Sequence, residues 1–191
     1  QGDCVAMPGL LDTPPRCRVP VHRVTERSGV IFLAKGQPEV RPYTHCMEGQ
    51  PVLTRLVTSE TRSTLIDVAE NILDATHTHF THKGLLRGLT SRRHRVRVEV
   101  TGGPGWVEAS YTGEDRQSGL VSALLDGARV RTVGRYRHPG IAELEYWGPR
   151  GLVLATTFHL RQADAETVGG VGFLVAPRGP LAPLKALAFG P

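Results

Sequence analysis

The sequence contains little lysine and no long apolar run. Of its 23 basic residues 20 are arginines, and these are scattered along the chain to give a net charge of +5. The one dense group, at Arg92, Arg93, His94, Arg95 and Arg97, has no aromatic residues interleaved with it, and a solvated turn or strand edge is the commoner role of such a run. No apolar stretch approaches the ~18 residues that a membrane-spanning helix needs. The composition therefore predicts neither a nucleic-acid-binding protein nor a membrane protein.

Cysteine is scarce as well. Cys4, Cys17 and Cys46 form no CxxC pair, so the usual spacing of a zinc or dithiol motif is absent. An odd number of cysteines without a signal peptide is typical of reduced thiols, and we expect a cytoplasmic protein. The sequence begins with Gln1 rather than Met. We therefore expect it to be part of a longer protein.

The periodicity of apolar residues predicts an α+β fold. Two short strands, Val19–Val24 and Val30–Ala34, are separated by the turn residues Arg27-Ser28-Gly29 and indicate a hairpin. Thr58–His82 has apolar residues at three- and four-residue spacing, which predicts a long helix capped by Thr58 or Ser59.

After this helix the apolar period changes to two, which predicts an antiparallel meander. The expected strands lie around Val96–Val100, Val107–Tyr111, Val130–Gly134, Ile141–Tyr146, Leu152–Leu160 and Gly169–Val175. Short helices are expected at Ser118–Leu125 and from Leu181. Aromatic residues on or near these strands indicate either core packing, which is the commoner role, or the lining of a pocket. They are Trp106, Tyr111, Tyr136, Tyr146, Trp147 and Phe158.

The chemically informative segment follows the apolar part of the predicted helix. Asp74, His77, His79 and His82 occur within nine residues, and two imidazoles with a carboxylate form the usual non-haem Fe(II) ligand set. On an ideal helix His77 and His82 lie about 140° apart, so they share a metal only if the helix is interrupted between them. The intervening threonines are poor helix formers. The alternative is a histidine-rich helix end with no ligand, stabilised by the helix dipole.

The complete pattern here is Asn71-x2-Asp74-x2-His77-x4-His82. It resembles the mononuclear-iron motif of Rieske non-haem iron oxygenases, in the spacing of the demethylase and monooxygenase branch. The resemblance implies that His77 and His82 are iron ligands and that Asp74 is a carboxylate linking the iron site to the Rieske cluster of a neighbouring subunit. Asn71 would lie near the metal.

The resemblance extends over essentially the whole chain. Three stretches near the beginning are similar to the segment after the Rieske cluster motif of the family, namely Gly2–Pro8, Arg18–Val21 and Gly29–Leu33. It implies two parts: residues 1–38 as the end of a Rieske domain, and residues 39–191 as a helix-grip (START-like) catalytic domain cut short at its end. It also implies a mononuclear Fe(II), a [2Fe-2S] cluster, a reductase or ferredoxin as electron donor, a homotrimer, and O2 with a small organic substrate that is hydroxylated or demethylated.

Two family features are missing from the sequence. The C-x-H and C-x2-H ligands of the cluster do not occur, and the third iron ligand, a late carboxylate, is expected beyond Pro191. Asp164 and Glu166 are in a stretch typical of a hairpin turn, as is Asp126. We therefore expect this chain alone to be inactive as an oxygenase.

Two other functions remain open from the residues alone. The same fold could be a non-catalytic helix-grip module that binds an apolar small molecule without a metal. His77, His79 and His82 could instead hold a hydrolytic zinc, although nothing upstream completes such a site.

Overall fold

The computed structural model of the 191-residue chain describes residues 2–9, 16–36, 41–74, 95–113, 129–179 and 186. The chain divides into two units, residues 1–44 and 45–191. The prediction that the first unit is the end of a Rieske domain stays a prediction. Among the described residues no helix is long and apolar enough to cross a membrane.

The first unit contains the predicted hairpin. Strands β1 (His22–Arg27) and β2 (Val30–Lys35) pair antiparallel around a turn in which Ser28 and Gly29 both have positive φ, 52° and 79°. Two positive φ angles at the centre of a two-residue loop are what the right-handed strand twist requires, and glycine adopts them without strain. A shorter antiparallel contact precedes the hairpin, where Asp3 lies opposite Arg18.

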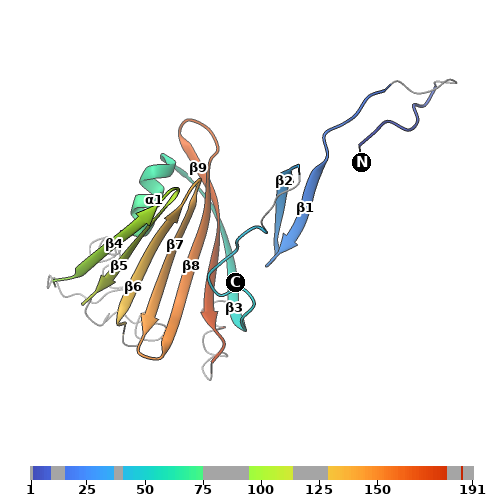
Figure 1. Ribbon diagram of the computed structural model, residues 1–191. Coiled ribbons are helices and arrows are strands. Elements are labelled where there is room, and N and C mark those ends of the chain that lie inside the picture. Colours follow the sequence, from blue (N-terminus) through green and yellow to red (C-terminus); the bar gives the residue numbers. More distant parts are fainter. Residues whose placement is uncertain are drawn as a thin grey trace. The chain divides into compact units, whose positions relative to one another are not determined.

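The second unit is one seven-stranded antiparallel sheet with the strand order β3-β9-β8-β7-β6-β5-β4 (Figure 1). Its strands are β3 (Val52–Arg62), β4 (Arg97–Gly103), β5 (Trp106–Thr112), β6 (Arg131–Arg137), β7 (Ile141–Gly148), β8 (Gly151–Gln162) and β9 (Thr167–Pro177). From β4 to β9 the strands follow one another as a meander, as the alternating pattern predicted. The single described helix, α1 (Leu65–Leu73), contacts β6, β7 and β8.

The start of the predicted helix was wrong. Residues 58–62 belong to β3, which the sequence analysis did not find, and α1 begins only after Thr64. The β-branched Thr58 and Thr61 favour a strand, and pairing with β9 along the whole length of β3 provides the backbone partners. The α+β class is confirmed by one helix on an antiparallel sheet, and the finer helix-grip assignment stays a prediction.

The sheet has two differently built faces because side chains alternate along each strand. A Cβ on Gly134 would lie 3.4 Å from Leu73 of α1, so Gly134 and its cross-strand neighbour Leu144 point to the helix. The opposite face contains Val133, Glu143 and Glu145, and all three are buried. Apolar core residues therefore occupy both faces, whereas the buried charges lie on the face away from α1.

Candidate functional site

Helix α1 starts at a well-defined cap. The Thr64 hydroxyl accepts a hydrogen bond from the Asp67 backbone N–H (3.2 Å) and lies 2.7 Å from the Asp67 carboxylate. This is the side-chain arrangement that satisfies the free N–H groups of a first turn. A further free N–H, that of Leu65, donates to Oε1 of Gln162 at the end of β8 (2.8 Å). The start of the helix is thus bonded to a strand 97 residues later in the sequence.

Gln162 also fixes the connection that follows β8. Its amide nitrogen donates to the carbonyls of Ser63, Asp164 and Thr167, at 2.8–3.2 Å. Asp164 and Glu166 lie in the turn between β8 and β9, as predicted. The Glu166 backbone N–H donates to the Asp164 carboxylate, and this hydrogen bond lowers the pKa of Asp164. Within this turn Asp164 has a structural role.

The end of α1 is held against the sheet by close backbone approach. Leu73 packs over Gly134, where an added Cβ would lie in van der Waals contact with Leu73 (3.4 Å), and the Tyr111 hydroxyl donates to the Leu73 carbonyl (3.4 Å). Asp74 is the C-cap residue with an extended backbone (φ −71°, ψ 96°), and its N–H donates to the Glu70 carbonyl. Asn71 and Asp74 are both exposed.

The structure therefore describes half of the predicted metal motif. Asn71 lies in the last turn of α1 and Asp74 directly follows it, whereas His77, His79 and His82 lie outside the described residues. In the described ranges, no group of three or more His, Cys, Asp or Glu side chains could hold a metal ion. The assignment of His77 and His82 as ligands stays a prediction.

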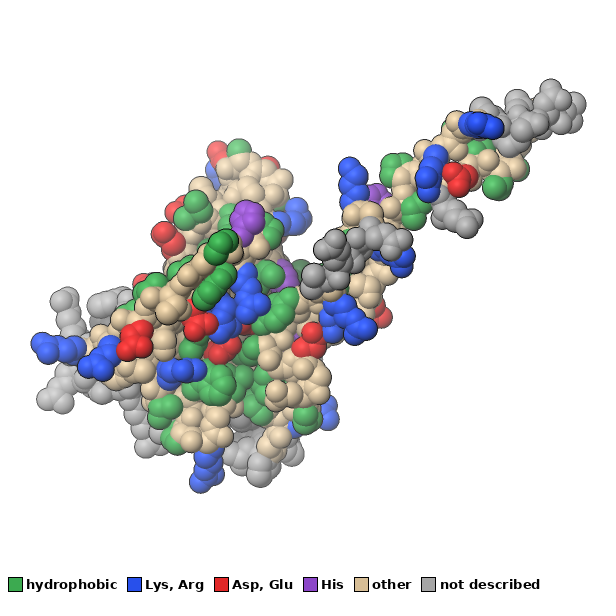
Figure 2. All heavy atoms as spheres, viewed as in Figure 1, with side chains coloured by type: hydrophobic (Ala, Val, Ile, Leu, Met, Phe, Trp, Pro, Cys, Tyr) green, Lys and Arg blue, Asp and Glu red, His purple; other side chains and the backbone are tan. Residues whose placement is uncertain are grey.

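Sequence reasoning missed a charged cluster on the face away from α1. The strand register places Glu108, Arg135, Glu143 and Thr157 in one row across β5, β6, β7 and β8. Arg135 bonds Glu108 at 2.6 Å, Glu143 at 2.5 Å and Glu145 at 3.0 Å. Figure 2 shows acidic and basic side chains side by side among hydrophobic ones over the middle strands.

Every carboxylate oxygen of the two most buried members has a donor. Glu143 accepts from Arg135 and from the Thr157 hydroxyl (2.8 Å), and Glu145 accepts from Arg135 and from the Trp147 indole (2.9 Å). Burial alone lowers the pKa of Arg135, but the hydrogen bonds that it donates to Glu145 and Glu108 raise its pKa overall. Because all four oxygens of Glu143 and Glu145 accept hydrogen bonds from neighbouring strands or from Trp147, the cluster is suited to holding the strands in register.

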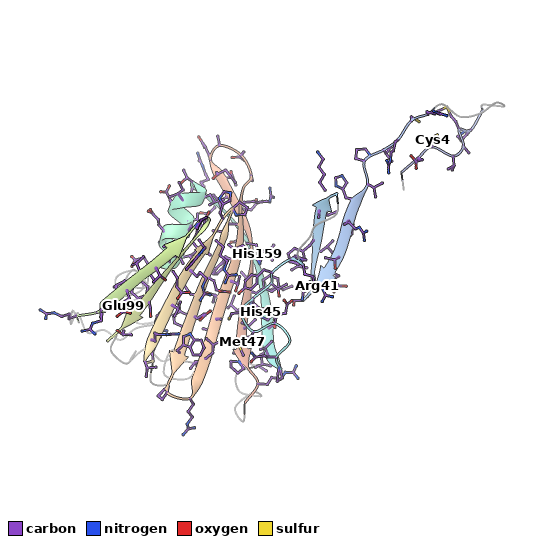
Figure 3. The ribbon with its side chains drawn as sticks, viewed as in Figure 1. Cys4, Arg41, His45, Met47, Glu99 and His159 are labelled. Carbon is purple, nitrogen blue, oxygen red and sulfur yellow. The ribbon has the colours of Figure 1, made fainter. Side chains whose placement is uncertain are left out.

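The segment 45–50 covers part of this charged face. The His45 ring contacts Phe173 of β9 at 5.9 Å between centroids, and His159 contacts the same ring at 5.6 Å (Figure 3). Burial lowers the pKa of His45, and its Nδ1 accepts the Met47 N–H at 3.3 Å. Burial also raises the pKa of Cys46 to about 12, with further contributions from Glu143 and Glu145.

The six aromatic residues do not line one pocket. The register directs Tyr111, Tyr136, Tyr146 and Phe158 to the helix side and directs Trp106 and Trp147 to the opposite side. Two hollows in the described residues also lie away from the motif. One, of about 620 Å³, is lined by the β1–β2 hairpin, and the other, of about 690 Å³, lies over β3, β8 and β9. Neither is lined by Asn71 or Asp74.

No protein-family model matches the sequence, and no curated protein matches it. Solved structures do match. Dicamba monooxygenase bound to dicamba superposes with a TM-score of 0.74 at 15% identity, over 97% of this chain and 58% of that one. The chain shares the fold of Rieske oxygenases.

Two proteins from Pseudomonas putida CBB5 support the same conclusion. NdmA with caffeine has a TM-score of 0.73 at 17% identity, over 98% of this chain and 55% of that one. NdmB has a TM-score of 0.66 at 13% identity, over 98% and 54%. The chain thus spans a little over half the length of these Rieske oxygenases, and the resemblance seen in the sequence is confirmed at the level of the fold.

Proposed function

We propose that this chain is the catalytic part of an oxygenase that uses a mononuclear non-haem Fe(II) to hydroxylate or demethylate a small organic substrate. The observation that carries the proposal is the position of the motif within the fold. Asn71 and Asp74 stand at the end of the helix that packs on the sheet, in a chain that shares its fold with dicamba monooxygenase and NdmA. The remaining motif residues, His77 and His82, follow within eight positions of Asp74.

The donor chemistry of the motif fits iron. Two neutral imidazoles are suitable ligands for Fe(II), and a nearby carboxylate can orient a ligating histidine through its second nitrogen. An uninterrupted helix would separate His77 and His82 by about 140°. The described helix ends at Leu73, before either histidine, and Asp74 has an extended backbone. When bound, iron would supply the activation of O2.

The described residues of this chain hold the end of α1, and with it Asp74, in place on the sheet. Gly134 allows the last turn of α1 to approach β6, and the Tyr111 hydroxyl binds the Leu73 carbonyl beside Asp74. Both contacts come from the seven-stranded sheet, so the end of α1 is held in place immediately before Asp74. Asp74 is exposed in the isolated chain, in line with a role across a subunit boundary, where it would link the iron to the cluster of a neighbouring subunit.

The proposal also includes a second cofactor, an electron donor and an oligomeric state. The complete protein would carry a [2Fe-2S] Rieske cluster, receive electrons from a reductase or ferredoxin, and assemble as a cytoplasmic homotrimer. The cluster, the electron donor and the trimer come from the resemblance, whereas the cytoplasmic location rests on the cysteine content of the sequence.

Fe(II) binding by the 191-residue chain tests the proposal. Iron bound per chain is measured under anaerobic dialysis for the wild type and for His77→Ala, His82→Ala and His79→Ala. We expect the first two variants to weaken Fe(II) binding by more than the 10–100-fold that loss of an outer partner costs, and His79→Ala to match the wild type. Circular dichroism of each variant checks the fold.

Each alternative gives a different result. Equal losses for all three variants, with a preference for zinc over iron, would support the hydrolytic zinc site. Unchanged iron binding in His77→Ala and His82→Ala would overturn the assignment of these ligands. A wild-type chain that binds an apolar probe but no iron would support a binding module instead.

A further inference from the structure

Cys4 and Cys17 lie opposite each other in the first unit. The Cys4 N–H donates to the Cys17 carbonyl at 3.0 Å, and the Val19 N–H donates to the Gly2 carbonyl at 2.9 Å. These two bonds bracket the antiparallel pair of Asp3 and Arg18. Cys4 is therefore the direct cross-strand neighbour of Cys17, and Figure 3 labels Cys4 in this extended segment.

This register brings the two thiols together on one side. Side chains of directly opposed residues point to the same face, and the Cα atoms of a hydrogen-bonded antiparallel pair are about 5.5 Å apart. A disulfide joins Cα atoms that are about 4.4–6.8 Å apart. Asp3 and Arg18 make their ion pair (3.5 Å) on the opposite face. The spacing thus suits a disulfide without movement of the backbone.

Contacts of the sulfur atoms agree with this geometry. The Cys4 thiol donates to the Ala6 carbonyl at 3.6 Å, and the hydrogen bond between the Cys17 and Cys4 thiols raises the pKa of Cys17. Cys17 is exposed and Cys4 is half-buried, so reagents in solution can reach Cys17. Cys46 belongs to the second unit, where burial raises its pKa to about 12. The pKa of Cys17 is also raised, but Cys17 is exposed whereas Cys46 is half-buried, so Cys46 is the poorer competitor for a small disulfide in solution.

We propose that Cys4 and Cys17 are a modification site that forms a reversible disulfide by exchange with a small disulfide such as oxidised glutathione. The exposed Cys17 attacks the small disulfide, which releases one thiol and leaves a mixed disulfide on Cys17. Cys4 then attacks the Cys17 sulfur and releases the second small thiol. The protein loses two electrons and two protons, and the small disulfide gains them to become two thiols.

The oxidised site closes residues 4–17 into a covalent loop. This crosslink fixes the short antiparallel contact before the hairpin, and its reduction restores the free thiols. The inference does not depend on the proposed oxygenase function, because it rests on residues of the first unit alone.

The experiment equilibrates the full chain in glutathione redox buffers and identifies the products by mass spectrometry after alkylation. We expect the wild type and Cys46→Ser to lose two hydrogens and, after trypsin, to yield the residues 1–16 peptide joined to Cys17-Arg18. Cys4→Ser and Cys17→Ser should instead carry glutathione on the remaining cysteine. A wild type that carries mainly glutathione on each cysteine, or a bond to Cys46, would contradict the proposal.

A second variant tests whether the antiparallel contact brings the two thiols together, or whether their closeness in the sequence is sufficient. Val19→Pro removes the N–H that donates to Gly2 but keeps both cysteines. In the same glutathione buffers, we expect the effective concentration of one thiol at the other to fall at least tenfold in Val19→Pro. It should fall similarly for the wild type in concentrated urea. An unchanged value in Val19→Pro would show that the antiparallel contact does not bring the thiols together.

Discussion

Replacing Arg135 by methionine should destabilise the sheet strongly. Methionine keeps much of the length of the side chain but removes every donor from the cluster. Glu143 and Glu145 have side chains that are 1% and 8% exposed, so little water could replace the guanidinium beside them. Removing one partner of a buried ion pair costs about 3–5 kcal/mol, because the other charge is left uncompensated.

The expected loss lies near the lower end of that range. Arg135 itself is 16% exposed and Glu108 is 31% exposed, so water can solvate part of what remains. We expect Arg135→Met to lower the free energy of unfolding by about 3 kcal/mol, out of the 5–15 kcal/mol typical of a domain. For a chain of this length the melting temperature should fall by about 6–12 °C.

Urea unfolding followed by tryptophan fluorescence measures this loss, since the Trp147 indole donates to Glu145 inside the cluster. The matched control is Arg62→Met. Arg62 and Glu166 form an ion pair at 2.6 Å with side chains 84% and 70% exposed, and its removal should cost about 0.5 kcal/mol or less. Adding Glu143→Gln to Arg135→Met should recover part of the loss through coupling. If Arg135→Met cost no more than Arg62→Met, the cluster would not be a buried structural unit.

Two further predictions concern the helix contact and the covering segment. Gly134→Ala should leave stability nearly unchanged, because the new Cβ would lie at ordinary contact distances of 3.4–3.5 Å from Leu73 and Leu144. Gly134→Val should lower the free energy of unfolding by about 1–3 kcal/mol because its larger side chain overpacks the contact. Equal melting temperatures of the two variants would refute close packing at Gly134. His45 has a pKa below its ordinary 6.5 in the folded chain, so its contribution to stability is present above pH 6.5 and is lost as pH falls below it. His45→Gln should therefore flatten the fall in urea stability below pH 6.5, and an unchanged pH dependence would count against this role.

The strands from β4 to β9 could be predicted because their apolar residues recur at short period and, apart from β5 and β6, each strand has a short connection to the next. β3 could not be found in this way, because it runs without a break into the cap of α1 and its pattern is that of a half-exposed edge strand. Two signals for it were present. Thr58 and Thr61 are β-branched, and Thr64 with Asp67 forms a capping pattern three residues apart.

The charged cluster could not be predicted from the sequence for a different reason. Glu143 and Glu145 alternate with apolar residues in β7, which predicts only that they share a face. Whether that face is buried depends on the packing of His45 and Met47 against the sheet, and the partner Arg135 is fixed by register. Asn71 and Asp74, in contrast, were placed in a candidate site by the resemblance of their motif to that of Rieske oxygenases, and the structure adds that both are exposed.

The pairing of β3 with β9 has a consequence for how the protein is made. Val52 pairs with Pro177, so the first strand of the second unit stays without its only described neighbour until the last strand leaves the ribosome. At synthesis rates of about 5–20 residues per second, that interval lasts on the order of 6–25 seconds. Local hairpins of the meander form far faster, in microseconds. The growing chain therefore carries an unpaired strand beside a largely assembled sheet, and its time of greatest exposure to chaperones and aggregation is set by the arrival of β9.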